Sequence, residues 1–109
     1  MNYKVEATPQ FLAEAKRLAK RYLSLRDDIA TLAEVLSNNP NQGTALGGGA
    51  YKIRMAITSK GKGKSGGARI ITCVKVMSAR VYLVSIYDKS EHSDISDHVL
   101  KDRIRNLPE

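Results

Sequence analysis

Two nearly continuous apolar runs, separated by a short turn, restrict how this chain can fold. They cover residues 69–76 and 81–87, and Met77-Ser78-Ala79-Arg80 lies between them. Runs of this length that are rich in Val, Ile and Tyr are typical of the inner strands of a sheet. Such strands are buried because helices cover the sheet. The sequence therefore predicts a hairpin of two inner strands with helices over at least one face.

The N-terminal part predicts a strand followed by a helix. Residues 3–7 alternate between polar and apolar and fit a short strand. Thr8 and Pro9 predict a helix start, because Thr is a good N-cap and Pro is tolerated at the first helical position. The apolar face of this helix is expected to contain Phe11, Ala15, Leu18, Ala19 and Tyr22.

A second helix is expected from Ser24, which fits an N-cap, to Asn38-Asn39-Pro40, which ends it. Asp27 and Asp28 fall in its first turn, where the helix dipole favours anions. Its apolar stripe contains Leu25, Ile29, Leu32 and Leu36. Two such helices in succession form an antiparallel hairpin, whose apolar stripe must pack on a sheet.

The sheet strands predict which side chains share a face. Residues 51–58 alternate, with Ile53, Met55 and Ile57 on one face and Lys52, Arg54 and Thr58 on the other. Residues 60–67 form a flexible basic loop, and the glycines between Gly43 and Gly67 mark turns, since a strand and not a helix follows each cluster. By the same alternation Arg69 points the same way as Ile71 and Lys75, and Tyr87 the same way as Leu83 and Lys89.

A last helix is expected to begin at Ser93 or Ser96 and to end at Pro108. Ser96 is preferred, because Ile95 before it and Leu100 after it have the spacing of a hydrophobic staple. The element order is then β-α-α-β-β-β-α. We predict a single α+β domain over residues 1–109, with the helical hairpin packed on a small, mostly antiparallel four-stranded sheet.

Charge is distributed unevenly along the chain. The net charge is +7, yet residues 35–87 contain no Asp or Glu and eight basic residues. A local positive field of this kind indicates a polyanionic partner. Four further cations lie on the polar face of the first helix, where they form either a solvated surface or a second patch for RNA phosphates: Lys16, Arg17, Lys20 and Arg21.

Other features exclude several classes of protein. Cys73 is the single cysteine, so no internal disulfide forms, and we expect a buried core residue in an intracellular, reducing environment. No signal segment or membrane-spanning run is present, which favours a cytoplasmic protein without a membrane partner. His92 and His98 have no Cys or third His near them, so neither a metal site nor another cofactor is expected.

Three motifs, taken together and in this order, resemble the RelE/HigB toxins of bacterial toxin–antitoxin pairs, within the RelE/ParE family. They are Tyr51-Lys52-Ile53-Arg54, then Lys62-Gly-Lys-Ser-Gly-Gly-Ala-Arg69-Ile-Ile, then Tyr82-Leu-Val-Ser-Ile-Tyr87-Asp-Lys89-Ser-Glu91. The resemblance covers essentially the whole chain in element order. It implies a RelE-like fold and an endoribonuclease (mRNA interferase) that inhibits translation by metal-independent, ribosome-dependent mRNA cleavage.

The resemblance also nominates site residues. The family's active face carries Lys and Arg on the strand after the helices, Arg at the start of the next strand, and basic or aromatic residues at the end of the last strand. These positions are Lys52, Arg54, Arg69, Tyr87 and Lys89 here. The chain departs from the RelE type at Arg54, where that type has Lys, and near Ser96, where it has a tyrosine.

Cleavage of RNA without a metal needs a proton acceptor, cations around the phosphorane and a proton donor for the leaving oxygen. We expect Arg54 and Arg69 to stabilise charge, because guanidinium matches phosphate bidentately. Lys52 is the candidate base, and Tyr87 is expected to stack on a nucleobase or to act as acid or base. Further phosphate contacts are expected from Lys60, Lys62, Lys64 and Lys75, with Lys89 beside them.

Two alternative functions remain at this point: a ParE-like inhibitor of DNA gyrase, and a non-catalytic module that binds RNA or the ribosome. The expected partners are the ribosome, mRNA and a cognate antitoxin, a helix-turn-helix DNA-binding protein with an acidic segment that folds on binding. Operator DNA is expected to be contacted only through that antitoxin.

Overall fold

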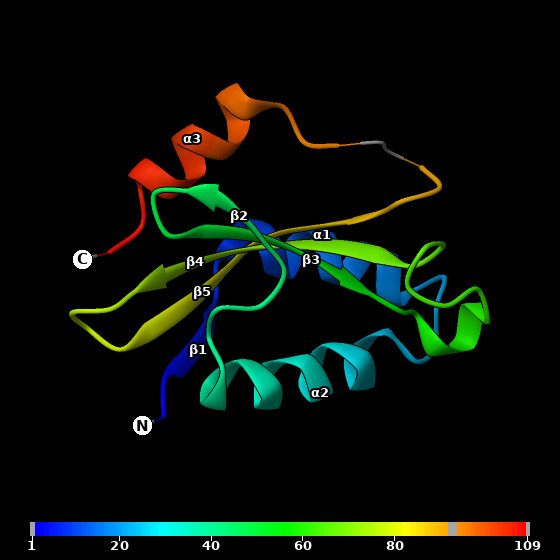
Figure 1. Ribbon diagram of the computed structural model, residues 1–109. Helices are drawn as coiled ribbons and strands as arrows, with labels where there is room; N and C mark the ends of the chain where they lie inside the picture. Colours follow the sequence, from blue (N-terminus) through cyan, green and yellow to red (C-terminus); the bar gives the residue numbers. More distant parts are fainter. Residues whose placement is uncertain (1, 92–93, 109) are drawn as a thin grey trace.

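A five-stranded mixed sheet lies between the helical hairpin and the C-terminal helix (Figure 1). The computed structural model describes residues 2–91 and 94–108. Its elements are β1 (Lys4–Ala7), α1 (Pro9–Ala19), α2 (Leu25–Asn38), β2 (Thr44–Gly47), β3 (Ala50–Met55), a 3₁₀ turn (Thr58–Lys60), β4 (Ala68–Lys75), β5 (Arg80–Asp88) and α3 (Asp97–Arg105). The strand order is β1-β5-β4-β3-β2, and only β1 and β5 run parallel. The predicted α+β class is confirmed.

The prediction of four strands is wrong by one, because residues 44–47 form β2. This strand is exposed along its whole length and pairs antiparallel with β3, where Thr44 lies opposite Lys52. The turn into β3 requires glycine at Gly49, which has φ +84° and a backbone oxygen that accepts from the N–H of Val74 at 2.8 Å. A strand of only four residues, Thr-Ala-Leu-Gly, is too short to show an alternating pattern, so its formation depends on the neighbouring strand.

Two of the three predicted N-cap residues make the capping hydrogen bond. The Thr8 hydroxyl oxygen accepts from the Phe11 N–H at 3.2 Å, and its hydroxyl donates to the Leu83 carbonyl at 3.1 Å. Ser96 caps α3 in the same way by accepting from the Val99 N–H, whereas Ser93 lies outside the described residues. Ser24 occupies the N-cap position of α2 but makes no capping bond.

The side chains of Ser24 and Asp28 instead hold the segment after β3. The Asp28 carboxylate accepts from the Thr58 N–H at 2.9 Å and from its hydroxyl at 2.6 Å, and the Ser24 hydroxyl oxygen accepts from the Ser59 N–H at 2.8 Å. These bonds draw residues 58–60 into a 3₁₀ turn against α2. The strand predicted over 51–58 therefore ends at Met55.

Two hydrophobic cores form, one on each face of the sheet. The larger lies under α1 and α2 and includes Phe11, Leu18, Leu36 and Ile70. The smaller lies under α3 and contains Ile71, Cys73, Tyr82, Val84 and Leu100, so Cys73 is a core residue as expected. Among the described residues, no helix is long and apolar enough to cross a membrane.

A β-bulge at Val84 reverses which residues of β5 face which core. Ile71 pairs with Ser85, but the next residue of β4, Thr72, pairs with Leu83, so Val84 has no partner on β4. Leu83 and Ile86 consequently lie in the same core although they are three residues apart. The expectation that Tyr87 points the same way as Leu83 is wrong, because alternation restarts after the bulge.

Candidate active site

Strand pairing brings three predicted site residues into one row across the sheet. Arg54 on β3 lies opposite Arg69 on β4, and Arg69 lies opposite Tyr87 on β5. Side chains that are directly opposite each other in antiparallel strands stand roughly 4.5–5.5 Å apart at Cβ. Lys52 precedes Arg54 by two residues and shares its face of β3. The row lies beyond the part of the sheet that α3 covers.

Arg69 closes the basic loop. Its side chain donates to the carbonyl oxygens of Lys64 at 2.9 Å, Ala68 at 3.2 Å and Ser65 at 3.4 Å, and the residue is only 6% exposed. Among the described residues no carboxylate forms an ion pair with it. Arg69 is therefore a buried cation that fixes the loop and presents positive charge to Tyr87.

Tyr87 is held as a neutral phenol. Its hydroxyl donates to Oδ1 of Asp94 at 3.1 Å, and the residue is 6% exposed. Burial, together with the negative charge of Asp94, raises the pKa of Tyr87 to about 12, although Arg69 acts in the opposite direction. At neutral pH this group is a proton donor and not a base.

Asp94 is the site residue that the sequence interpretation missed. Its Oδ1 accepts from the Lys52 ammonium group at 3.0 Å and from the backbone N–H of Ile95 at 2.9 Å, in addition to Tyr87. The hydrogen bond from Lys52 is the main cause that lowers the pKa of this carboxyl, so Asp94 is ionised. An ammonium group held in this way donates hydrogen bonds, which suits Lys52 to anchoring an anion rather than to accepting a proton.

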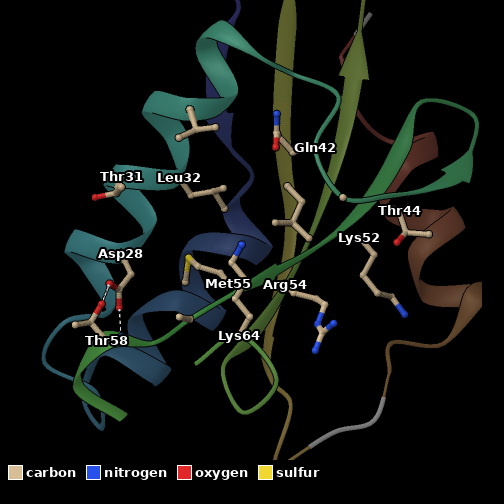
Figure 2. A pocket seen from close by; sticks show the side chains of 14 residues that line it. Asp28, Thr31, Leu32, Gln42, Thr44, Lys52, Arg54, Met55, Thr58 and Lys64 are labelled. Atoms are coloured by element: carbon tan, nitrogen blue, oxygen red, sulfur yellow. Dashed lines mark hydrogen bonds between the residues drawn. The ribbon is translucent and has the colours of Figure 1, made fainter. Parts of the chain in front are cut away.

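A pocket of about 750 Å³ lies beside the row, between α2 and the outer edge of β3. Figure 2 shows Lys52 and Arg54 extending from β3 on the side away from α2, while Leu32 and Met55 lie between the strand and the helix. Lys64 from the basic loop also lines it. The pocket thus has an apolar floor and a cationic rim; it shares Arg54 with the row, and Lys52 lines it as well.

Comparison with known proteins identifies the family. Residues 15–106 match the family model described as the RelE toxin of the RelE/RelB toxin–antitoxin system. The chain belongs to the RelE toxin family. It is therefore the toxin of a toxin–antitoxin pair.

Solved RelE-family structures share the fold at low sequence identity. A mutant of the E. coli toxin RelE in the free state matches with a TM-score of 0.66 and 15% identity, over 99% of this chain and 100% of that one. The isolated E. coli RelE toxin gives 0.61 and 18% identity, over 96% and 99%. The RelBE2 toxin–antitoxin complex from Mycobacterium tuberculosis gives 0.61 and 17%, over 86% and 95%.

Lys60 of this RelE-family toxin is engaged inside the protein. Its ammonium group donates to Oδ1 of Asp88 at 2.7 Å and to the Ser90 hydroxyl at 3.0 Å, and the Tyr22 hydroxyl donates to Oδ2 of Asp88 at 2.6 Å. Burial alone would raise the pKa of Asp88, but the bonds from Lys60, Tyr22 and Ser90 outweigh it and hold the pKa below its usual range. The predicted phosphate contact at Lys60 is thus already occupied by a carboxylate.

The other predicted cations lie at different distances from the row. Lys62 and Lys64 are exposed on the basic loop, and Lys89 is exposed where its N–H donates to the Gly67 carbonyl at 3.1 Å. Lys75 lies at the opposite end of β4 from Arg69, about 20 Å away at the usual rise per residue of a strand. Within residues 2–91 and 94–108, Arg54, Lys62, Lys64 and Lys89 have no ion-pair partner.

Ligands for a metal ion are not gathered near the row. No group of three His, Cys, Asp or Glu side chains that could hold a metal ion occurs in the described part of the chain. His98 belongs to α3, and His92 lies outside the described residues. The chemistry available here comes from cations, a phenol and a carboxylate.

Proposed function

We propose that this toxin inhibits translation by cutting mRNA on the ribosome. The observation that supports it best is the row Arg54–Arg69–Tyr87 with Lys52 on the same face, in a chain of the RelE toxin family. Fixed cations and a phenol on one face supply two of the three functions that metal-free phosphodiester cleavage requires, namely charge stabilisation and a proton donor. The toxin acts in the cytoplasm, where its substrate is found.

The residues take distinct roles in this reaction. The 2′-hydroxyl of the substrate gives its proton to a water molecule and its oxygen attacks the neighbouring phosphorus, the bond to the 5′-oxygen breaks, and that oxygen takes up a proton. Tyr87 supplies the proton, because a neutral phenol with a pKa of about 12 matches a developing alkoxide. Arg54 binds the phosphate directly, and Lys52 helps to hold it. Arg69 is buried, so it contributes positive charge to the site while its side chain holds the basic loop.

Lys62, Lys64 and Lys89 surround the row and bind backbone phosphates. They are exposed, and none has an ion-pair partner among the described residues, so they contribute affinity and salt dependence but no sequence preference. Lys60 and Lys75 are left out of this set, since Lys60 is bound to Asp88 and Lys75 lies at the far end of β4.

The partners follow from the same surface. An antitoxin with an acidic segment neutralises the exposed cations, and its helix-turn-helix domain brings the pair to operator DNA. The M. tuberculosis relative is described as a toxin–antitoxin complex. Co-expression with the protein from the adjacent reading frame, followed by gel filtration, tests this partner.

A matched pair of variants tests cleavage. The purified toxin, Arg54→Ala and Lys75→Ala are added to a cell-free translation reaction, and the 5′ ends of the mRNA are mapped. New ends are expected with the wild type and with Lys75→Ala, and they should decrease at least about 10²-fold with Arg54→Ala. Arrest without new ends would show that the toxin blocks translation and does not cut.

A non-catalytic RNA-binding module is the second candidate. It is favoured by the fact that Lys52 and Arg69 are both bound within the protein, to Asp94 and to loop carbonyls. In that case RNA binds with equal affinity to the wild type and Tyr87→Phe, and neither yields new mRNA ends. Inhibited DNA supercoiling with intact mRNA would instead select gyrase as the target.

A further inference from the structure

Two carboxylates that follow β5 form ion pairs with cations of the toxin. Asp94 accepts from Lys52 at 3.0 Å, and Glu91 lies 2.8 Å from Arg21 and 3.6 Å from Arg17 on α1. The reaction proposed above uses neither carboxylate. The two arginines belong to the cation group of the first helix, which the sequence left open as a solvated surface or a patch for RNA phosphates.

These two sets of ion pairs differ in exposure from the buried pair between Lys60 and Asp88. The side chains of Asp88 and Lys60 are 0% and 11% exposed, so their pair is a permanent part of the fold. In the outer pairs, Asp94 is 58% and Lys52 28% exposed, and Arg17, Arg21 and Glu91 are 52%, 51% and 29% exposed, so each pair has one well-exposed partner and one that is partly covered. Ion pairs that water reaches from one side contribute little to stability compared with a buried pair, so another anion can replace the carboxylate.

The donors around Asp94 are those that a phosphate oxygen takes. One ammonium group, one phenol and one backbone N–H converge on Oδ1 of this side chain. Carboxylate and phosphate oxygens accept the same charge-assisted hydrogen bonds. Asp94 therefore stands at a position that suits an anionic oxygen beside the proposed proton donor.

The two ion-paired positions are connected around the edge of β5. A small pocket of about 150 Å³ is lined by Arg17, Tyr87 and Asp94, together with residues of α3. A strand of RNA that passes over Lys52 and Tyr87 consequently reaches Arg17, and Arg21 lies four residues further on, in the turn that follows α1.

We propose that RNA backbone phosphates replace the carboxylates of Asp94 and Glu91 when the toxin binds its substrate. Arg17 and Arg21 then form a second phosphate-binding position beyond the row on the sheet, and the free toxin keeps both positions filled with its own carboxylates. This inference rests on the proposed RNA-cleaving function and extends it to the path of the substrate.

The test measures binding separately from cleavage. A short fluorescent RNA with 2′-O-methyl groups cannot be cut by attack of the 2′-oxygen, and its anisotropy reports affinity for purified toxin at about 0.1 M salt. Glu91→Gln and Asp94→Asn are each expected to bind about two- to fivefold more tightly than the wild type. Asp102→Asn, an exposed position on α3 with the same charge change, is expected to bind as the wild type does.

Coupling between variants identifies the position that each carboxylate fills. In the Arg17→Ala/Arg21→Ala background, Glu91→Gln should no longer tighten binding, while Asp94→Asn should still do so. The arginine variant itself should bind the RNA more weakly than the wild type. Equal affinities for Glu91→Gln, Asp94→Asn and Asp102→Asn would overturn the inference, as would unchanged binding after loss of both arginines.

The cleavage assay separates this inference from the function on which it rests. If new mRNA ends form but the carboxylate variants do not bind RNA more tightly, the proposed ribonuclease function stands and the second phosphate-binding position is rejected. If the carboxylate variants bind RNA more tightly but no new mRNA ends form, the second phosphate-binding position is supported and the proposed ribonuclease function is rejected. If the wild type binds this RNA too weakly to measure, Glu91→Gln/Asp94→Asn must bind it measurably, and failure of both proteins contradicts the inference.

Discussion

Arg69 and Tyr87 lie directly opposite each other on β4 and β5, and the bulge at Val84 is what gives them a common face. Without the extra residue, Tyr87 would share the side of Leu83 and point into the core under α1 and α2. The phenol instead stands beside a buried guanidinium, with Arg54 on the next strand. The arrangement of the proposed site therefore depends on one unpaired residue of a strand.

Replacing Tyr87 by Phe should remove the proton donor and leave the fold intact. We expect mRNA cleavage to fall by about 10²-fold, while affinity for RNA falls by no more than about tenfold, because the ring keeps its packing and only one hydrogen-bond donor is lost. Tyr82→Phe is the matched control, since Tyr82 lies on the same strand in the core under α3. Equal cleavage by wild type and Tyr87→Phe would exclude Tyr87 as the acid.

The pH dependence of cleavage follows from the same group. With a pKa of about 12, the Tyr87 phenol stays protonated as pH rises through the neutral and mildly alkaline range. Single-turnover cleavage of a model RNA should therefore show no decline up to about pH 9.5, where an acid with an ordinary tyrosine pKa would begin to deprotonate. A decline with a midpoint near neutral pH would indicate a different proton donor.

Arg69→Lys should loosen the basic loop although the charge is kept. A lysine cannot reproduce the planar guanidinium that donates to three carbonyl oxygens, so residues 61–67 lose their anchor. Hydrogen exchange of these amides should become faster, and cleavage should fall with it. Arg54→Lys is the comparison, because Arg54 makes no hydrogen bond to the loop among the described residues, and its amide exchange pattern should match the wild type.

Asp88→Asn should destabilise the toxin by about 3 kcal/mol, because it leaves the buried Lys60 without its counter-charge. The pKa of Asp88 is lowered in the folded state, so its contribution is fully present above the unfolded value of about 4 and is lost as pH falls below it. Urea unfolding at pH 7 and at about pH 3 should show a smaller pH effect in the variant than in the wild type. Asp102→Asn at the surface should behave like the wild type.

The bulge itself is held by Glu14 and Arg103. Glu14 accepts from the Ile86 N–H at 3.2 Å and binds Arg103, which donates to the Val84 carbonyl at 3.2 Å. Glu14→Ala should cost about 2–3 kcal/mol and reduce cleavage, since the backbone that orients Tyr87 loses its partner. Glu14→Gln keeps an acceptor for Ile86 and should recover part of both losses. If both variants cleave normally, the bulge does not need this support.

Local chemistry made much of the fold predictable. The Thr8-Pro9 helix start, the Ser96 cap and the inner hairpin all follow from side-chain and backbone rules that act within a few residues. The face shared by Lys52 and Arg54 follows from strand alternation. The element order was right, apart from β2, whose sequence has no pattern of its own.

The parts that sequence reasoning missed depend on contacts between distant segments. Lys60 meets Asp88 across 28 positions, and Asp94 meets Lys52 across the sheet, so neither pairing leaves a local signal. The bulge at Val84 is invisible in an apolar run, where every residue suits either face. One signal was present: acidic residues follow a long segment that has none, and opposite charges on one chain tend to meet.

The ion pair between Lys60 and Asp88 has a consequence for recognition. It connects the start of the basic loop to the end of β5, and Arg69 hydrogen-bonds to carbonyl oxygens further along the same loop. The loop is therefore anchored at two places before RNA binds. The conformational entropy of ordering those anchor points is lost during folding rather than during binding. The lysines between these two anchors are therefore preorganised for phosphate binding, and less conformational entropy is lost when the substrate binds.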